Sequence, residues 1–169
     1  SALVLDQTDS ILHFRGTGIV TGAVNLESGT LKSSGSPTLS GALTQSGDIT
    51  IDILGDQRLN YTGPPISIGA STISLSGGGA FANTNPLVLD NAASKLLLSS
   101  ITLENVSTSV GNSLGVEVEN DSAINSFLVS NITPVSIGSG KTLSGSIGVT
   151  GGSIKLINTG TLASTVSMS

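Results

Sequence analysis

Apolar and polar positions alternate along nearly the whole chain. The recurring unit is a triplet in which two aliphatic residues flank one small or polar residue, as at Leu87/Leu89 and Ile49/Ile51/Ile53. Successive side chains of a β-strand point to opposite faces of a sheet, so this period of two predicts strands with one buried face. Helical spacing is sustained nowhere along the chain. The pattern therefore predicts an all-β protein built from many short strands.

Clusters of glycine and serine separate the triplets. Examples are residues 33–37 (SSGSP), 77–79 (GGG) and 138–140 (GSG). Glycine adopts positive φ without a steric penalty, so these clusters predict tight turns. Pro65 and Pro134 each precede an aliphatic-Ser-Ile-Gly segment. Since proline lacks the N–H that a central strand donates, we expect both at corners where a coil begins.

Two internal echoes indicate a repeating coil. Residues 3–6 and 87–90 both read LVLD, an offset of 84, and residues 65–69 (PISIG) resemble residues 134–138 (PVSIG), an offset of 69. Four coils of about 21 residues and three of about 23 would account for both offsets, and these lengths fall in the range of solenoid repeats. The chain is therefore predicted to form a single-stranded parallel β-solenoid of about eight coils, one domain over residues 1–169.

In such a solenoid, each strand stacks about 4.8 Å from the equivalent strand of the next coil, so like residues form ladders. Leu87 and Leu89 are expected to point inward, with residues 91–94 turning a corner. Leu3 and Leu5 are expected to do the same four coils earlier.

The composition favours a narrow aliphatic core. Hydrophobic residues make up 37% of the chain, but only one Tyr and three Phe are present, with no Trp and no Cys. A β-sandwich is the alternative fold, although immunoglobulin-like sandwiches usually contain a core Trp or a Cys pair. The absence of cysteine also removes disulfides, thiolate metal sites and thiol nucleophiles.

The charge balance limits the expected partners. The net charge is -5 and only six residues are Lys or Arg, whereas nucleic-acid affinity comes largely from cationic side chains that neutralise phosphates. We therefore expect no nucleic-acid partner. No apolar run approaches the ~18 residues of a transmembrane segment, so no membrane span is expected.

Residues 22–31 (GAVNLESGTL) resemble the passenger-associated β-strand repeat of bacterial autotransporters, in which a glycine precedes a GTL motif. The two LVLD segments are similar to coils of large β-helical adhesins. The resemblance covers one copy of the motif. It implies a right-handed parallel β-helix that is secreted or exposed on a cell surface, and a bacterial source.

Two motifs that suggest catalysis or cofactor binding do not fit their surroundings. Residues 16–22 (GTGIVTG) nearly match a dinucleotide-binding fingerprint, but the last spacing is one residue too long and a strand-like segment follows. His13, the only histidine, lies near Asp6, Asp9 and Ser10, which suggests a hydrolytic triad. These residues share one strand and its turn, so a triad with an oxyanion hole is not expected. We predict no catalytic residue, no cofactor and no enzymatic activity.

Two sets of carboxylates are the candidate metal ligands. Within each set the residues share parity along a predicted strand, so they could line one outer face and offer oxygen ligands to Ca²⁺. The candidates are Asp48, Asp52 and Asp56, and Glu117, Glu119 and Asp121. Neither set has the Gly-Gly-x-Gly-x-Asp pattern of calcium-binding β-rolls, and solvated charges that discourage sideways sheet pairing explain them equally well.

The leading functional hypothesis is a structural or adhesive β-solenoid, either a passenger segment or a subunit of a surface filament. Because a solenoid has open strand edges at both ends, head-to-tail self-association is expected. Host or cell-surface glycans or proteins are the other expected partners. A carbohydrate-binding or carbohydrate-active β-helix is the alternative, although the chain is poor in exposed aromatic rings. Ice binding through outward threonine ladders is a third hypothesis, which lacks Thr-x-Thr triplets.

Overall fold

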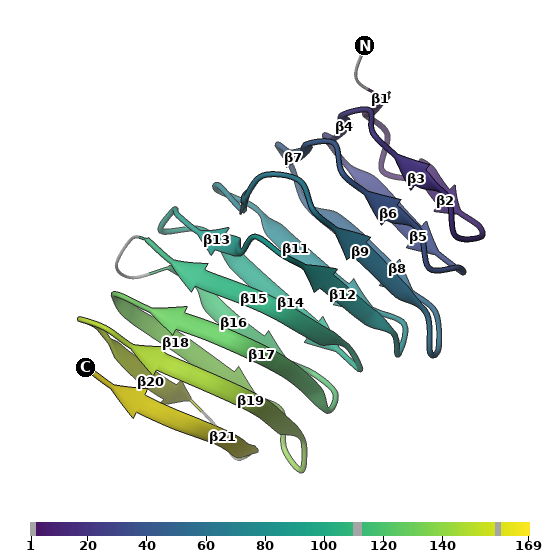
Figure 1. The fold of residues 1–169 in the computed structure, drawn as a ribbon. Helices are drawn as coiled ribbons and strands as arrows, with labels where there is room; N and C mark the ends of the chain where they lie inside the picture. Colours follow the sequence, from purple (N-terminus) through teal and green to yellow (C-terminus); the bar gives the residue numbers. More distant parts are fainter. Residues whose placement is uncertain (1–2, 110–112, 158–159) are drawn as a thin grey trace.

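The computed structural model describes residues 3–109, 113–157 and 160–169, which form 21 β-strands and no helix. All pairs between these strands are parallel and join segments one coil apart. One of the sheets contains eight strands, one from each coil. The predicted β-solenoid of about eight coils is confirmed, and the sandwich alternative is wrong. In Figure 1, the strands nearer the viewer run toward the upper left and the more distant strands run toward the lower right. The coils follow one another from the upper right to the lower left, so the solenoid is right-handed.

Three stacks of strands make the walls of the solenoid (Figure 1). The side sheet contains β1 (Leu3–Leu5), β4 (Val24–Leu26) and β7 (Leu43–Gln45). The back sheet contains β2 (Ile11–Phe14), β5 (Gly29–Ser33), β8 (Ile49–Ile53), β11 (Thr72–Ser76), β14 (Lys95–Ser99), β16 (Gly115–Val118), β18 (Ile132–Ile137) and β20 (Ser153–Ile157). The front sheet contains β3 (Ile19–Val20), β6 (Thr38–Leu39), β9 (Arg58–Tyr61), β12 (Ala80–Asn83), β15 (Thr102–Thr108), β17 (Ser122–Val129), β19 (Thr142–Val149) and β21 (Thr161–Met168), together with β10 (Ile66–Ser67) and β13 (Leu87–Leu89).

The cross-section of the solenoid changes at β15. In the N-terminal half, each coil has separate front and side strands joined by a corner. The first residues of β15 pair with β12, and its last residues, from Val106 to Thr108, pair with β13. One long strand therefore replaces two short strands and their corner. From β15 onward each coil has two walls instead of three.

The coils differ in length. Paired residues of the back sheet are 19 positions apart between β2 and β5 and 24 apart between β8 and β11. The offset of 84 does span four coils. The three strands of the side sheet, β1, β4 and β7, are followed along the axis by β10 and β13, which contact them one coil at a time although they join the front sheet. The interpretation of the second offset is wrong. Ile66 belongs to β10 of the front sheet, whereas Val135 belongs to β18 of the back sheet and follows Val116 in its column.

One continuous aliphatic cluster fills the interior. Leu87 and Leu89 are fully buried, as predicted, and residues 91–94 form the corner before the next buried pair. Leu5 is also buried, and Leu3 lies in the same inward-facing column as the buried Val24, as predicted. The Leu3 side chain is 48% exposed because no strand of the described residues pairs with β1 on its outer side.

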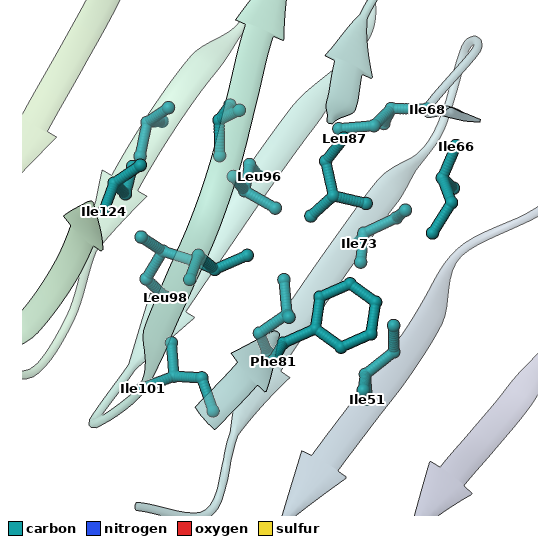
Figure 2. Close-up of a cluster of buried hydrophobic side chains, with 14 of the residues drawn as sticks. Ile51, Ile66, Ile68, Ile73, Phe81, Leu87, Leu96, Leu98, Ile101 and Ile124 are labelled. Atoms are coloured by element: carbon teal, nitrogen blue, oxygen red, sulfur yellow. The ribbon is translucent and has the colours of Figure 1, made fainter. Parts of the chain in front are cut away.

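Three of the four aromatic residues, Phe14, Tyr61 and Phe81, belong to three-walled coils, and Phe127 is buried in a two-walled coil. Tyr61 and Phe81 belong to adjacent coils and their rings stack, with centroids 6.0 Å apart and planes 23° from parallel. Figure 2 shows Phe81 packed among aliphatic side chains such as Ile51 and Ile73. Three walls enclose more volume per coil than two, so rings fit here without distorting the ladders.

Tyr61 also closes the corner between the front and side walls of its coil. Its hydroxyl accepts a hydrogen bond from the Leu43 N–H at 3.1 Å and donates one to the Pro64 carbonyl at 2.7 Å. Burial raises the pKa of the Tyr61 hydroxyl above the ordinary value, and the Leu43 hydrogen bond opposes this in part.

An alkaline titration tests the role of Tyr61. Since the unfolded chain ionises this tyrosine first, we expect the free energy of unfolding to be constant up to pH about 10 and to fall as the pH rises from there through the folded pKa. Tyr61→Phe should remove this alkaline decline and cost roughly 1–2 kcal/mol at neutral pH by leaving two backbone groups without partners. Tyrosinate absorbance reports this group alone, because the chain has one Tyr and no Trp. Ionisation at the ordinary pKa of tyrosine would contradict the assignment.

Asn83 occupies the next coil at the end of β12, where the corner disappears. Its Oδ1 accepts hydrogen bonds from the N–H groups of Glu104 at 3.2 Å and Asn105 at 3.3 Å. Its Nδ2 donates to the carbonyls of Asn85 and Asn105, and the residue is fully buried. The Asn83 carboxamide therefore takes the place of backbone groups as the hydrogen-bond partner of the next coil, at the point where three walls become two.

Candidate functional site

The first set of calcium candidates surrounds β8, and its members contact different neighbours. Asp48 accepts a hydrogen bond from the Thr72 N–H at 2.7 Å, one coil away. Asp52 pairs with Lys32 at 3.2 Å across the outer face of the back sheet, and Asp56 lies exposed in the following corner. Two of the three carboxylates therefore already have protein partners.

The second set behaves in the same way. Glu117 pairs with Lys95 at 2.6 Å, and Asp121 accepts a hydrogen bond from the Thr142 N–H at 2.7 Å. Glu119 is exposed. Within residues 3–109, 113–157 and 160–169, no three His, Cys, Asp or Glu side chains gather to hold one ion. Among the described residues, neither set is therefore brought together around one point.

The structure places a serine beside His13, but it is one that sequence proximity missed. His13 Nε2 lies 2.8 Å from Ser34 Oγ, one coil further on, and Arg15 Nε donates to His13 Nδ1 at 3.1 Å. A guanidinium only donates, so Nδ1 is unprotonated and the ring proton is on Nε2. His13 therefore donates to Ser34, whereas a serine nucleophile needs Nε2 as the acceptor of its proton.

The predicted neighbours of His13 do not contribute to this pair. Among the described residues, none of the hydrogen bonds of His13 involves Asp6, Asp9 or Ser10, and a cation occupies the position where a triad has a carboxylate. The glycine-rich segment at residues 16–22 is equally structural: its first glycine turns the corner with φ 99°, and β3 follows instead of a helix.

The back-to-front corner, which leads from each back strand to the next front strand, changes length along the solenoid. It contains four residues before β6 and β9 (34–37 and 54–57), three before β12 (77–79), two before β15 (100–101), three before β17 (119–121) and four before β19 (138–141). The shortest corner lies in the middle and longer corners flank it on both sides. This edge of the molecule, at the lower right of Figure 1, is therefore recessed at its centre.

The recess contains a groove made of two adjoining hollows. They have volumes of about 280 and about 440 Å³, and they share Gly78 and Thr102. The smaller hollow is lined by Gly55, Asp56, Gln57, Arg58, Gly78, Gly79, Ala80 and Thr102. The larger is lined by Gly78, Ser100, Ile101, Thr102, Asp121, Ser122, Ala123, Thr142 and Ser144. We name these two hollows together the corner groove.

Ser100 turns the shortest corner with a strained backbone. Its φ is 57°, and it is the one non-glycine residue with positive φ in the described part of the chain. The preceding coil makes its corner with Gly77 (φ 105°) and Gly78 (φ 87°), which avoid the Cβ clash of this region. Serine therefore occupies a position where glycine would adopt the same backbone conformation at a lower energetic cost.

Hydroxyl groups dominate the larger hollow. Ser122 is satisfied internally, since its Oγ accepts from the Ile101 N–H and donates to a backbone carbonyl. The hydroxyls of Ser100, Thr102 and Thr142 have no hydrogen-bond partner among the described residues. No described aromatic side chain lines the groove.

No pattern along the chain indicates this groove directly. Its lining residues come from five coils and are separated by about twenty positions at each step. They become recognisable only when the coils are aligned in register, because the groove results from differences in corner length.

The described residues contain no helix of the length and apolarity that crossing a membrane requires. No family model matches the chain, and neither the curated proteins nor the solved structures yield a significant match.

Proposed function

We propose that this chain is a structural or adhesive β-solenoid, a secreted or cell-surface segment of bacterial origin that serves as a rigid rod. The observation that carries the proposal is the uninterrupted aliphatic ladder, which joins β1 to β21 through one core. Each coil is supported by its neighbours, so the architecture provides length and stiffness. The outer surface is mainly polar and weakly charged, with 10% charged residues in the chain.

The rod also presents two apolar ends, and we propose that copies associate head to tail through them. At the C-terminal end, a hollow of about 320 Å³ is lined by Val149, Gly152, Ser153, Ile154, Leu156, Leu162, Val166 and Met168. Leu156 is 57% exposed and Met168 is 83% exposed. At the opposite end, Leu3 is 48% exposed and the inward-facing Leu12 is only partly buried. A parallel coil from a second copy would cover these side chains.

The strand columns support this arrangement. The column that begins at β1 ends at the C-terminal half of β21, and the back sheet begins at β2 and ends at β20. Inward-facing residues such as Ile66 donate their N–H toward the next coil, and outward-facing residues such as Thr38 donate toward the preceding coil. The two ends of the rod therefore carry complementary rows of unpaired donors and acceptors.

A pair of matched substitutions tests the association. Val166 is 47% exposed at the C-terminal end, and Leu128 is 46% exposed on the outer face of the front sheet. Wild-type protein should show a mass that rises with concentration in sedimentation equilibrium, and rods in electron micrographs. Val166→Asp should weaken the association at least about tenfold, because the charge must be buried at the junction. Leu128→Asp should associate like the wild type.

Single-chain particles at the highest soluble concentration would contradict head-to-tail association, as would equal effects of the two substitutions. The ice-binding hypothesis gains no support from the structure. The outward column of the back sheet has Thr30 and Thr50 in adjacent coils and continues with Ser74 and Leu97, which ends the threonine ladder.

A further inference from the structure

We infer that the corner groove binds an extended, uncharged polysaccharide chain that lies along the axis of the solenoid. The inference deepens the adhesive branch of the proposed function and rests on it for its biological use. It identifies a site and a class of ligand, namely a linear neutral glycan, and the residues that would contact it.

The shape of the groove suits a linear ligand. The groove extends over five coils, from the corner at Gly55 to the corner at Thr142, which is about 19 Å at the spacing of stacked strands. Four-residue corners at 54–57 and 138–141 border the recess at its two ends. A small compact ligand would leave most of this length in water, whereas a chain of several sugar units would fill it.

The polar groups of the groove match those of a glycan. The free hydroxyls of Ser100, Thr102 and Thr142 can both donate and accept, as sugar hydroxyls do. Asp121 is fixed by its hydrogen bond from the Thr142 N–H, which leaves the second carboxylate oxygen for a ligand hydroxyl. Such charge-assisted hydrogen bonds are the stronger ones.

The charges of the groove argue against an anionic ligand. Asp56 and Asp121 stand in the two hollows. The one cationic side chain of the lining, Arg58, pairs with Glu104 at 3.2 Å. A polyanion would therefore meet two carboxylates and a cation that is already neutralised.

Ser100 gives the inference a second, independent support. Its left-handed backbone is costly for any residue with a Cβ, and such strain persists where the side chain has a use. Ser100 is exposed, and no hydrogen bond joins its hydroxyl to another described residue. Ser100 turns the shortest corner and lines the larger hollow, where a ligand would pass.

The expected affinity is low, because the groove lacks aromatic rings on which sugars stack. A dissociation constant on the order of 1 mM is expected for one groove, and multivalent display along an assembled rod would raise the avidity. Detection therefore requires a method that reports millimolar binding residue by residue.

The test uses nuclear magnetic resonance on the isotope-labelled chain. The probes are linear, uncharged oligosaccharides of glucose, mannose, galactose and N-acetylglucosamine, each with lengths up to several units. At least one series should shift the amide signals of Ser100, Thr102, Asp121 and Thr142, with saturation at millimolar concentration and tighter binding as the oligosaccharide lengthens.

Two substitutions in one column of the front sheet provide the matched comparison. Ala123 lies on the floor of the groove, and Ala163 lies two coils further along the same column, outside it. Ala123→Arg should reduce the affinity at least tenfold by filling the groove, whereas Ala163→Arg should bind like the wild type. Asp121→Asn, which keeps an oxygen for the Thr142 N–H, should bind at least threefold more weakly and covers the case that Ala123→Arg does not fold.

The inference is overturned if no neutral oligosaccharide shifts the amides of the groove, if only anionic glycans do so, or if Ala123→Arg with a wild-type fold retains full affinity. These outcomes are separate from the test of end-to-end association. Val166 belongs to the end of the rod and not to the groove lining, so either result can fail while the other holds.

Discussion

Asn83→Ala is expected to lower the free energy of unfolding by about 3 kcal/mol. The carboxamide of Asn83 accepts from two N–H groups and donates to two carbonyls where β12 gives way to β15. Alanine leaves these backbone groups without partners in a buried place, and each such group costs roughly 1–3 kcal/mol unless water reaches it. Chemical denaturation followed by circular dichroism measures the loss.

Asn60→Ala is the control for this substitution. Asn60 is half-buried on the preceding coil, where its Nδ2 donates to the Pro37 carbonyl at 3.3 Å and its Oδ1 accepts from Arg58. Because water can replace both contacts, its loss should cost less than about 1 kcal/mol. Similar losses for both variants would show that the transition between cross-sections does not depend on the Asn83 carboxamide.

Phe81→Ala should have the largest effect of any single truncation, about 4 kcal/mol. The ring is fully buried, stacks on Tyr61 and lies between the front and back walls, as Figure 2 shows. Removing it loses the transfer free energy of the ring and leaves a cavity that neighbouring coils cannot close without breaking their ladders. Denaturation gives the magnitude, and hydrogen exchange gives its location.

The same residue type at the first coil provides the comparison. Phe14 is half-buried at the end of β2, so Phe14→Ala should cost about 1 kcal/mol. Since solenoid coils contact only their nearest neighbours, Phe81→Ala should reduce amide protection first in the coils of β9, β12 and β15. A uniform loss of protection over all coils would contradict this nearest-neighbour description.

The fold could be predicted because the period of two is a local property of each strand. A triplet such as Leu96/Leu98 shows its buried face without knowledge of its partner, and both residues are fully buried. The register between coils is not local, since coil lengths range from 19 to 24 residues. For that reason the similarity of residues 65–69 to residues 134–138 misled. Pro65 does precede β10 at a corner, but the expectation of a corner at Pro134 is wrong, because Pro134 lies inside β18 and is paired there with Lys155. The two segments also lie in different walls.

The corner groove and the partners of the candidate site residues depend on the register between coils, so they could not be predicted from the sequence. The parity of Asp48, Asp52 and Asp56 along the chain is real, but a lysine and a backbone N–H of neighbouring coils engage two of these carboxylates. Likewise, His13 meets Ser34 because one coil separates them, which its neighbours in sequence could not indicate. The change from three walls to two also left no clear pattern, since Asn83 looks like an ordinary turn residue at the end of a strand.

The direction of the backbone hydrogen bonds has a mechanical consequence. They run from coil to coil, parallel to the long axis, while the strands lie across it (Figure 1). Tension between the two ends therefore acts along these bonds and separates one coil at a time, instead of shearing a whole sheet at once. Each separated coil releases 19 to 24 residues, or about 65 to 80 Å of extended chain. Under tension the solenoid would therefore lengthen in steps, and each step would dissipate mechanical work.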